Sequence, residues 1–499
     1  MIEIRLNDNA FEQDIRELLM AFFPGESFSY QQEPECRLGV EGEKNEDGTA
    51  WSLRLFGPDA RDDLRPEGFS PVPELAWEIQ HRAEPVQAVP ESRTETKNRL
   101  KRRMYALLVC CTGRELPWGS LTGIRPVKIA LTRLEEGMGR EEIAAYMKRN
   151  YFASDEKIRL SVETALREQR LLSGLDYENG YSLYVGIPFC PTTCLYCSFT
   201  SYPIGKWEGR TGLYLDALEK ELAYVAARKK GCPPDTVYFG GGTPTSLCAE
   251  DQERLLNKLE TLFDMKQVRE FTVEAGRPDS ITEEKLQVLR RHGVTRISIN
   301  PQTMQQKTLD LIGRRHTVEE VKDKFRLARS LGFDNINMDL IIGLPQEEME
   351  DVASTMEQIR RLAPDSLTVH SLAIKRAARL NTMKEVYKDL KIINTQEMID
   401  LTSRCAGEMG LTPYYLYRQK NMAGNFENVG YAAPGKACLY NILIMEEKQT
   451  IIGCGAGTAT KRVFPAENRV ERTENVKNVE QYIERIDEML ERKKALLFN

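Results

Sequence analysis

The chain has 499 residues, which at about 150 residues per domain predicts about three domains and excludes a single small binding module. Hydrophobic residues make up 41% and charged residues 29% of the chain, a globular composition that excludes a disordered or collagen-like protein. The 69 Lys and Arg residues against 75 Asp and Glu residues give a net charge of -6, so the composition argues against a dedicated nucleic-acid or anionic-membrane binder.

The sequence predicts a cytoplasmic protein without a membrane span. No apolar run approaches the roughly 18 residues of a membrane helix, and Met1 to Asp8 contain neither the basic nor the apolar segment of a signal peptide. Eleven cysteines, an odd number, favour reduced thiols over a disulfide framework. The four histidines do not fall at metal-ligand spacing, so we expect metal chemistry to depend on sulfur.

The first 175 residues are predicted to form an N-terminal extension of two small domains. Residues 1–85 alternate strand-like segments with one helical segment, which predicts an α+β domain. Residues 86–175 carry apolar residues at helical spacing, which predicts a helical domain. The expected elements are strands at 2–6, 36–41 and 51–56, and helices at 11–23, 102–110 and 141–151.

Residues 176–376 are predicted to form an α/β domain, because short β-rich runs are each followed by a loop and a helical segment. The six runs are 183–187, 236–239, 270–275, 295–300, 336–342 and 366–371. Six such units are typical of a parallel sheet, open or partly closed as a barrel, with its chemistry at the carboxyl ends of the strands.

Residues 377–499 form a mixed tail, which we expect to be a C-terminal α+β cap that covers the substrate. The expected elements are a helix at 395–409, an aromatic loop at 413–431, a strand at 450–453 and a final helix at 479–494.

Three cysteines follow the first of the six runs with the spacing C-x3-C-x2-C: Cys190, Cys194 and Cys197. Thiolates from one short loop can hold an iron–sulfur cluster, and three ligands to four irons leave one iron open for a chelating ligand. A structural zinc site is the alternative, but it needs a fourth ligand, and no Cys or His lies between Cys197 and Cys232.

Further polar or glycine-rich positions follow the next strands. Gly240 to Pro244 come after the second run, and glycines let a backbone approach a ligand closely. Glu274 ends the third run, Gln302 follows the fourth, and Asp339 lies within the fifth. A carboxylate in an apolar strand is costly unless it has a partner, so we expect Asp339 to face the site.

The motif C-x3-C-x-aromatic-C resembles the signature of the radical S-adenosylmethionine (SAM) superfamily. The resemblance implies a partial (β/α)6 barrel and a [4Fe-4S] cluster held by Cys190, Cys194 and Cys197. It also implies SAM at the open iron and a radical SAM oxidoreductase that forms a 5′-deoxyadenosyl radical. In such enzymes the one-electron chemistry belongs to the cofactor, and the protein supplies binding and orientation.

From Tyr184 to about Arg376 the chain is similar to the oxygen-independent coproporphyrinogen III oxidase (coproporphyrinogen dehydrogenase) family, on the motifs Tyr-x-x-Ile-Pro-Phe-Cys, Gly-Gly-Gly-Thr-Pro-Thr and Asp-Leu-Ile-x-Gly-Leu-Pro. The tail and the long N-terminal part resemble its HemZ-like subgroup. The resemblance implies these SAM contacts: Tyr184, Tyr196, Gly241, Gly242, Thr243, Glu274, Gln302, Arg314, Asp339 and Ala373. It implies one or two SAM molecules, with Gly242, Thr243, Gln302, Arg314 and Asp339 nearer the second.

The implied function is oxidative decarboxylation of coproporphyrinogen III to protoporphyrinogen IX in haem and porphyrin biosynthesis. It implies a tetrapyrrole substrate, coproporphyrinogen III or haem, and a low-potential electron donor such as flavodoxin or ferredoxin. Tyr184 and His370 are the candidate catalytic residues. Candidate carboxylate partners are Lys375, Arg376 and Arg418, and candidate aromatic faces are Tyr414, Tyr415 and Tyr417; ordinary surface charges and core aromatics are the simpler alternative.

The chain departs from the family pattern at two positions. Gly186 stands where the family has His, and Phe199 where it has a further Cys. Two alternatives therefore stay open: a haem-binding chaperone or transfer protein that binds SAM without turning over coproporphyrinogen, and another radical SAM enzyme that acts on haem or RNA.

Overall fold

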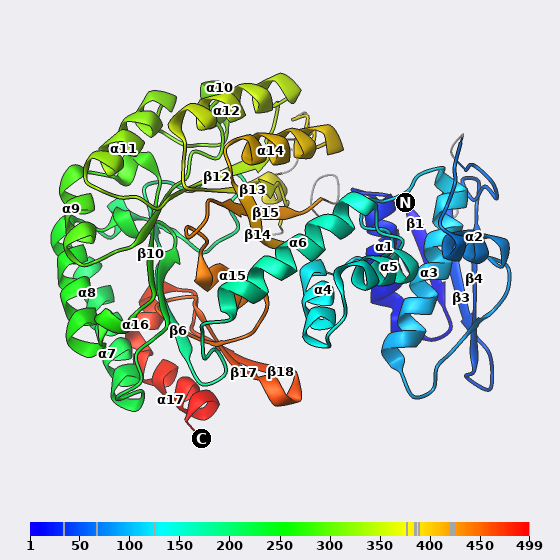
Figure 1. Ribbon diagram of the computed structural model, residues 1–499, viewed down its shortest axis with the longest axis horizontal. Helices are drawn as coiled ribbons and strands as arrows, with labels where there is room; N and C mark the ends of the chain where they lie inside the picture. Colours follow the sequence, from blue (N-terminus) through cyan, green and yellow to red (C-terminus); the bar gives the residue numbers. More distant parts are fainter. Residues whose placement is uncertain are drawn as a thin grey trace. The chain divides into compact units, whose positions relative to one another are not determined.

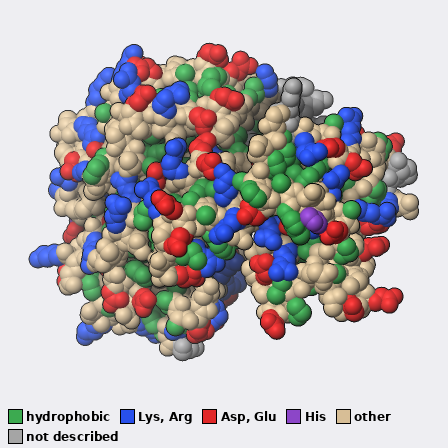
Figure 2. Space-filling view, turned by 45° about the vertical axis from the view of Figure 1, so that its right-hand side comes forward, with side chains coloured by type: hydrophobic (Ala, Val, Ile, Leu, Met, Phe, Trp, Pro, Cys, Tyr) green, Lys and Arg blue, Asp and Glu red, His purple; other side chains and the backbone are tan. Residues whose placement is uncertain are grey.

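The computed structural model describes residues 1–499 except 33–34, 66–67, 124, 376–377, 384–386, 388–389, 420–425 and 499. The chain divides into two compact units, Met1–Leu166 and Arg167–Asn499 (Figure 1). The predicted subdivision of these units near residues 85 and 376 stays a prediction. None of the described helices is both long and apolar enough to cross a membrane. On the face drawn in Figure 2, basic and acidic side chains are interspersed on each unit.

The first unit contains a mixed sheet in the order β2-β1-β3-β4-β5, with β1 parallel to β3 and β3 antiparallel to β4. The strands are β1 (Ile2–Leu6), β2 (Phe28–Ser29), β3 (Leu38–Lys44), β4 (Ala50–Phe56) and β5 (Val86–Gln87). The helices are α1 (Glu12–Phe22), α2 (Pro73–Gln80), α3 (Arg93–Thr112), α4 (Pro126–Glu135), α5 (Arg140–Tyr151) and α6 (Asp155–Leu172), which runs on into the second unit. Helix α1 buries Ile15, Leu18, Leu19 and Phe22, whose spacing places them on one helix face. They join Ile2 and Ile4 of β1 in one hydrophobic core.

The second unit is built on a sheet of eleven strands among the described residues, in the order β14-β15-β13-β12-β11-β10-β9-β6-β16-β17-β18. Its centre confirms the six predicted strands, which pair in parallel. They are β6 (Tyr181–Ile187), β9 (Thr236–Gly241), β10 (Glu270–Gly276), β11 (Arg296–Ile299), β12 (Ile336–Ile342) and β13 (Ser366–Ser371). These strands are buried almost throughout, as expected where helices cover a parallel sheet.

Helices connect these strands and lie in an arc outside them (Figure 1). They are α7 (Thr211–Arg228), α8 (Ala249–Leu262), α9 (Glu283–Arg291), α10 (Gln306–Leu311), α11 (Val318–Ser330) and α12 (Met349–Leu362). Two short paired strands, β7 (Phe189–Cys190) and β8 (Tyr202–Pro203), flank the cysteine loop between β6 and α7.

The tail extends the sheet at both edges. Its strands are β14 (Thr412–Tyr417), β15 (Asn428–Ala432), β16 (Thr450–Cys454), β17 (Ala459–Phe464) and β18 (Arg469–Glu474). Its helices are α13 (Arg379–Thr382), α14 (Gln396–Glu408), α15 (Leu439–Met445), α16 (Val479–Glu484) and α17 (Ile486–Leu497). Strand β15 pairs with β13, whereas β16 pairs in parallel with β6.

Two predictions for the tail are wrong. The expected aromatic loop at 413–431 is a pair of antiparallel strands over most of its described length, because tyrosines fit a pleated, half-buried surface well. The expected single final helix is two helices that meet at Arg485.

A buried ion pair ties the end of the tail to α7. The ammonium of Lys493 lies 2.5 Å from Oε1 of Glu221, and the two side chains are 1% and 0% exposed. The other Glu221 oxygen accepts hydrogen bonds from the Gly455 backbone N–H at 2.7 Å and the Tyr482 hydroxyl at 2.6 Å. Lys493 also donates to Oδ1 of Asn475 at 3.0 Å. Such satisfied geometry is what a buried ion pair requires.

We expect Lys493→Met to lower the free energy of unfolding by about 3–5 kcal/mol, because it leaves the Glu221 carboxylate buried without its cation. Urea denaturation measures this loss. The double variant Glu221→Gln with Lys493→Met is the matched control and is expected to regain a large part of it. A loss of less than about 1 kcal/mol in Lys493→Met is the scale of a surface ion pair. It would contradict the assignment of a buried pair.

Candidate functional site

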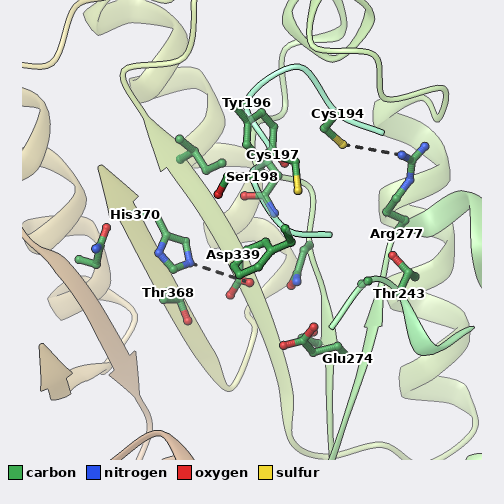
Figure 3. Close-up of a pocket in the computed structure, with 18 of the residues that line it drawn as sticks. Cys194, Tyr196, Cys197, Ser198, Thr243, Glu274, Arg277, Asp339, Thr368 and His370 are labelled. Atoms are coloured by element: carbon green, nitrogen blue, oxygen red, sulfur yellow. Dashed lines mark hydrogen bonds and ion pairs between the residues drawn. The ribbon is translucent and has the colours of Figure 1, made fainter. Parts of the chain in front are cut away.

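A cavity of about 350 Å³ lies at the carboxyl ends of the parallel strands. This volume is in the range of ligand pockets. Of the predicted site residues, those that line it are Cys190, Cys194, Tyr196, Cys197, Gly241, Gly242, Thr243, Glu274, Gln302, Arg314, Asp339, His370 and Ala373. In Figure 3 the cysteine loop lies above Glu274, and His370 lies on the side opposite Arg277.

Tyr184 is the predicted site residue that the cavity lining does not include. Its ring stacks on Tyr238 and Tyr440, with ring centroids 6.0 Å away in each case. Tyr238 itself lines the cavity. Tyr184 therefore supports the cavity wall from behind.

Backbone contacts with the glycine loop fix the cysteine loop. The N–H groups of Gly242 and Thr243 donate to the carbonyls of Ile187 and Phe189 at 2.8 and 2.7 Å. A Cβ on Gly242 would lie 2.5 Å from the Phe189 oxygen, so only glycine permits this approach. The Thr243 hydroxyl lies 3.5 Å from the sulfur of Cys190.

The three thiols occupy one wall of the cavity without being gathered around a point. Among the described residues, no group of three His, Cys, Asp or Glu side chains is arranged to hold a single metal ion. Burial raises the pKa of the Cys197 thiol to about 11 and also raises the pKa of Cys190. The thiolate forms therefore need added positive charge, which the irons of a cluster would supply.

The strand ends beside the thiols offer polar atoms for a ligand. Ser298 Oγ, Asn300 Oδ1 and Gln302 Oε1 are buried and have no hydrogen-bond partner among the described residues. Gln302 has a left-handed backbone, φ 69°, fixed by hydrogen bonds to both sides of Leu340 on β12. Buried polar groups are normally satisfied, so these three atoms fit a polar ligand such as SAM.

Glu274 and Arg314 are held in place by tyrosines. The Tyr238 hydroxyl donates to Glu274 Oε1 at 2.6 Å, and burial raises the pKa of the Glu274 carboxyl to about 7. Arg314 donates to the Tyr196 hydroxyl at 3.1 Å and to the Asn300 carbonyl at 2.5 Å. Hydrogen bonds within the protein thus fix the direction of both side chains.

His370 lies on β13 across from Asp339 on β12. Its Nε2 is 4.0 Å from Asp339 Oδ2 (Figure 3). Its Nδ1 is 3.4 Å from the Tyr417 hydroxyl. Burial lowers the pKa of His370, although the Asp339 carboxylate opposes this shift. A neutral imidazole beside a carboxylate can accept a proton.

The two departures from the family pattern have different surroundings. A Cβ at Gly186 would lie 2.5 Å from the Thr458 methyl group, which belongs to the turn after β16. The tail therefore fills the space that a His side chain would need. Phe199 instead lines the cavity, 68% exposed, with the ammonium of Lys375 5.6 Å from the centroid of its ring.

Only some of the predicted substrate contacts line the cavity. Lys375, Tyr415 and Tyr417 line the cavity. Tyr414 and Arg418 are buried and do not line it. Arg376 lies outside the described residues.

Several further polar residues line the cavity that the sequence did not predict, among them Arg277, Arg296, Asn300, Asn337, Thr368 and Asn428. Most of them lie within a strand or near its end, so alternation along each strand was the available signal. Arg277 lies beyond β10 and had no such signal.

Glu274 gives the cluster-free protein a pH-dependent stability. A carboxyl whose pKa rises from 4.5 to about 7 on folding stabilises the fold fully below pH 4.5, and this contribution is lost as the pH rises through 7. Relative to Glu274→Gln, the wild-type free energy of unfolding should fall by about 2–3 kcal/mol between pH 5 and 8. Urea denaturation across this pH range measures the fall. The hydrogen bond from Tyr238 lowers the pKa of Glu274, so in Tyr238→Phe the fall should occur at higher pH than in wild type. Parallel curves for wild type and Glu274→Gln would exclude the shifted pKa.

The chain is similar to known proteins of one superfamily. A sequence model of the Radical SAM superfamily matches residues 184–359. The oxygen-independent coproporphyrinogen-III oxidase-like protein HemZ of Bacillus subtilis is 41% identical over 465 residues, 92% of each chain. The heme chaperone HemW of Bacillus subtilis is 36% identical over 195 residues, 39% of this chain and 51% of the chaperone.

Among solved structures, the coproporphyrinogen III oxidase HemN of Escherichia coli superposes with a TM-score of 0.51. The two chains are 25% identical over 64% of this chain and 73% of that one. These similarities confirm the predicted resemblance and the predicted fold class. The chain therefore belongs to the HemZ-like family of the radical SAM superfamily, whose enzymes use a [4Fe-4S] cluster and SAM.

Proposed function

We propose that the chain is a cytoplasmic enzyme that decarboxylates coproporphyrinogen III to protoporphyrinogen IX without oxygen. The observation that carries the proposal is a single cavity with two kinds of wall. One wall has the cysteine loop and the polar strand ends. The other has His370, Lys375 and two tyrosines. A radical formed at the first wall would reach a substrate held at the second.

The proposed cluster ligands are Cys190, Cys194 and Cys197. When bound, the cluster and SAM supply a 5′-deoxyadenosyl radical by one-electron reductive cleavage. The proposed SAM contacts are Tyr196, Gly241, Gly242, Thr243, Glu274, Gln302, Arg314, Asp339 and Ala373, with Tyr184 supporting them from behind. Whether one or two SAM molecules bind is part of the same proposal.

The reaction must balance for each of two propionates. Each propionate loses one β-hydrogen atom, one electron and carbon dioxide, and becomes a vinyl group. The hydrogen atom goes to the radical, and the electron goes to a one-electron acceptor. A low-potential donor such as flavodoxin or ferredoxin would supply the electron that starts each cycle.

Lys375 and Phe199 are the proposed contacts for the tetrapyrrole. Three arginines of the described part of the chain also line the cavity, but they are buried and hydrogen-bonded within the protein. Lys375 is exposed, so its ammonium can meet a propionate carboxylate, and the exposed ring of Phe199 can pack on the macrocycle. His370 lies between Asp339 and Tyr417 and is the proposed catalytic residue. As a base it would take the proton of a propionic acid group, so that the carboxylate can leave as carbon dioxide.

A haem carrier is the second candidate. The flat, exposed face of Phe199 suits a planar oxidised macrocycle, and HemW of Bacillus subtilis, a heme chaperone, is similar over 195 residues. In that case SAM would bind without turnover of coproporphyrinogen.

The SAM contacts predict a measurable loss of affinity. Glu274→Ala and Asp339→Ala should each weaken SAM binding to the reconstituted protein by about 1.5–3 kcal/mol, roughly 10- to 150-fold, because a hydrogen bond to a charged group is lost. Both variants should keep about four irons per chain, whereas Cys194→Ala should not. Isothermal titration and iron analysis measure these effects, with Glu350→Ala on the exposed face of α12 as the control. Unaltered SAM affinity in both variants would refute the assignment.

Product analysis decides between enzyme and carrier. Anaerobic incubation of the reconstituted chain with SAM, reductant, an electron acceptor and coproporphyrinogen III should release carbon dioxide and vinyl products together. Lys375→Gln should raise the KM for coproporphyrinogen about tenfold or more, without changing SAM affinity. Stoichiometric haem binding with coproporphyrinogen left unchanged would instead establish the carrier.

A further inference from the structure

Arg277 lies beside the cysteine loop, where a kink at the end of β10 places it. The pairing of β10 with β11 shifts register between Glu274 and Gly276, and Gly276 has a left-handed backbone, φ 62°. Such bulges redirect side chains next to functional sites. Here the kink directs Glu274 into the cavity and Arg277 toward Cys194 (Figure 3).

The guanidinium of Arg277 is fixed on two edges. Its Nε and Nη2 donate to the two oxygens of Asp279 at 2.9 and 2.6 Å. Its Nη1 donates to the carbonyl and hydroxyl of Thr192 at 3.0 and 2.7 Å, and to the sulfur of Cys194 at 3.7 Å. Because Asp279 binds Nε and Nη2 together, the remaining nitrogen, Nη1, is directed toward the cysteine loop.

This charge is buried, with 4% of the side chain exposed. Arginine stays protonated in proteins, so a fixed positive charge lies within hydrogen-bonding distance of Cys194. Behind it, the fully buried His316 has its Nδ1 4.0 Å from Asp279. If the ion pair of Arg277 and Asp279 served only to join their loop to the cysteine loop, it would not require an N–H of Arg277 directed at the sulfur of Cys194.

We propose that Arg277 is a positioning residue that raises the reduction potential of the cluster bound by Cys190, Cys194 and Cys197. The inference rests on the proposed cluster site. Hydrogen bonds to cluster sulfurs and nearby positive charge stabilise the reduced cluster, which carries one more negative charge. Arg277 thereby eases the uptake of the electron that a low-potential donor delivers.

The test is an anaerobic redox titration of the reconstituted full-length chain, followed by electron paramagnetic resonance, without SAM or substrate. In Arg277→Met the midpoint should become more negative, with the ratio of reduced to oxidised cluster about tenfold lower at the wild-type midpoint. Arg277→Lys keeps the charge and should recover part of the shift. Asp279→Asn removes the opposing charge and should move the midpoint in the other direction.

The outcomes separate this inference from the proposed function. If Arg277→Met holds four irons with an unchanged midpoint, Arg277 only joins the loops and the inference is wrong. If Arg277→Met takes up no iron, the midpoints of Arg277→Lys and Asp279→Asn decide the matter. The inference predicts that they shift in opposite directions, whereas a residue that only packs the loops predicts no such pattern. A wild-type chain that assembles no cluster would overturn both the cluster site and the role of Arg277.

Discussion

The close approach of two backbones at the end of β9 is the constraint on which the site depends. Gly242 and Thr243 donate hydrogen bonds to Ile187 and Phe189, and a Cβ on Gly242 would lie only 2.5 Å from the Phe189 oxygen. This contact fixes the start of the cysteine loop against the sheet. The loop's other anchors, such as the 2.9 Å hydrogen bond from Leu195 to Ile312, then place its thiols over the strand ends.

The tail is part of the same sheet and therefore has a structural role in addition to the predicted one of covering a substrate. Strand β16 pairs with β6, the strand that leads into the cysteine loop, and so removes an exposed sheet edge there. The tail also contacts a central strand. The carboxylate of Glu270 on β10 accepts hydrogen bonds from the backbone N–H groups of Leu439 and Tyr440 at 2.6 and 3.3 Å. The tail is thereby bonded to the strands that carry the site.

The sequence was sufficient for features that depend on local pattern. Central strands buried on both faces, such as Ile336–Ile342, have nearly continuous apolar runs, and their carboxyl ends must meet at one edge. The thiols, Glu274 and Asp339 could therefore be placed together without coordinates. Strand β14 was missed because its tyrosines suit a loop or a strand, and only pairing with β15 decides between them.

What the sequence could not supply are contacts between distant segments. Nothing near Arg277 indicates that its guanidinium reaches Cys194, 83 residues earlier. Likewise, the significance of Gly186 depends on Thr458, a residue of the tail.

The two departures from the family pattern lie on either side of the cysteine motif, yet neither disturbs the wall proposed to bind SAM. The turn at Thr458 closes the space beside Gly186, so that change is absorbed within the fold. Phe199 is different, because its ring stays exposed in the cavity next to Lys375. An exposed aromatic ring is costly in water and gains most from a ligand that covers it. The departure at Phe199 therefore bears on the proposed tetrapyrrole site, whereas the residues proposed for cluster and SAM line the cavity or lie directly behind its wall.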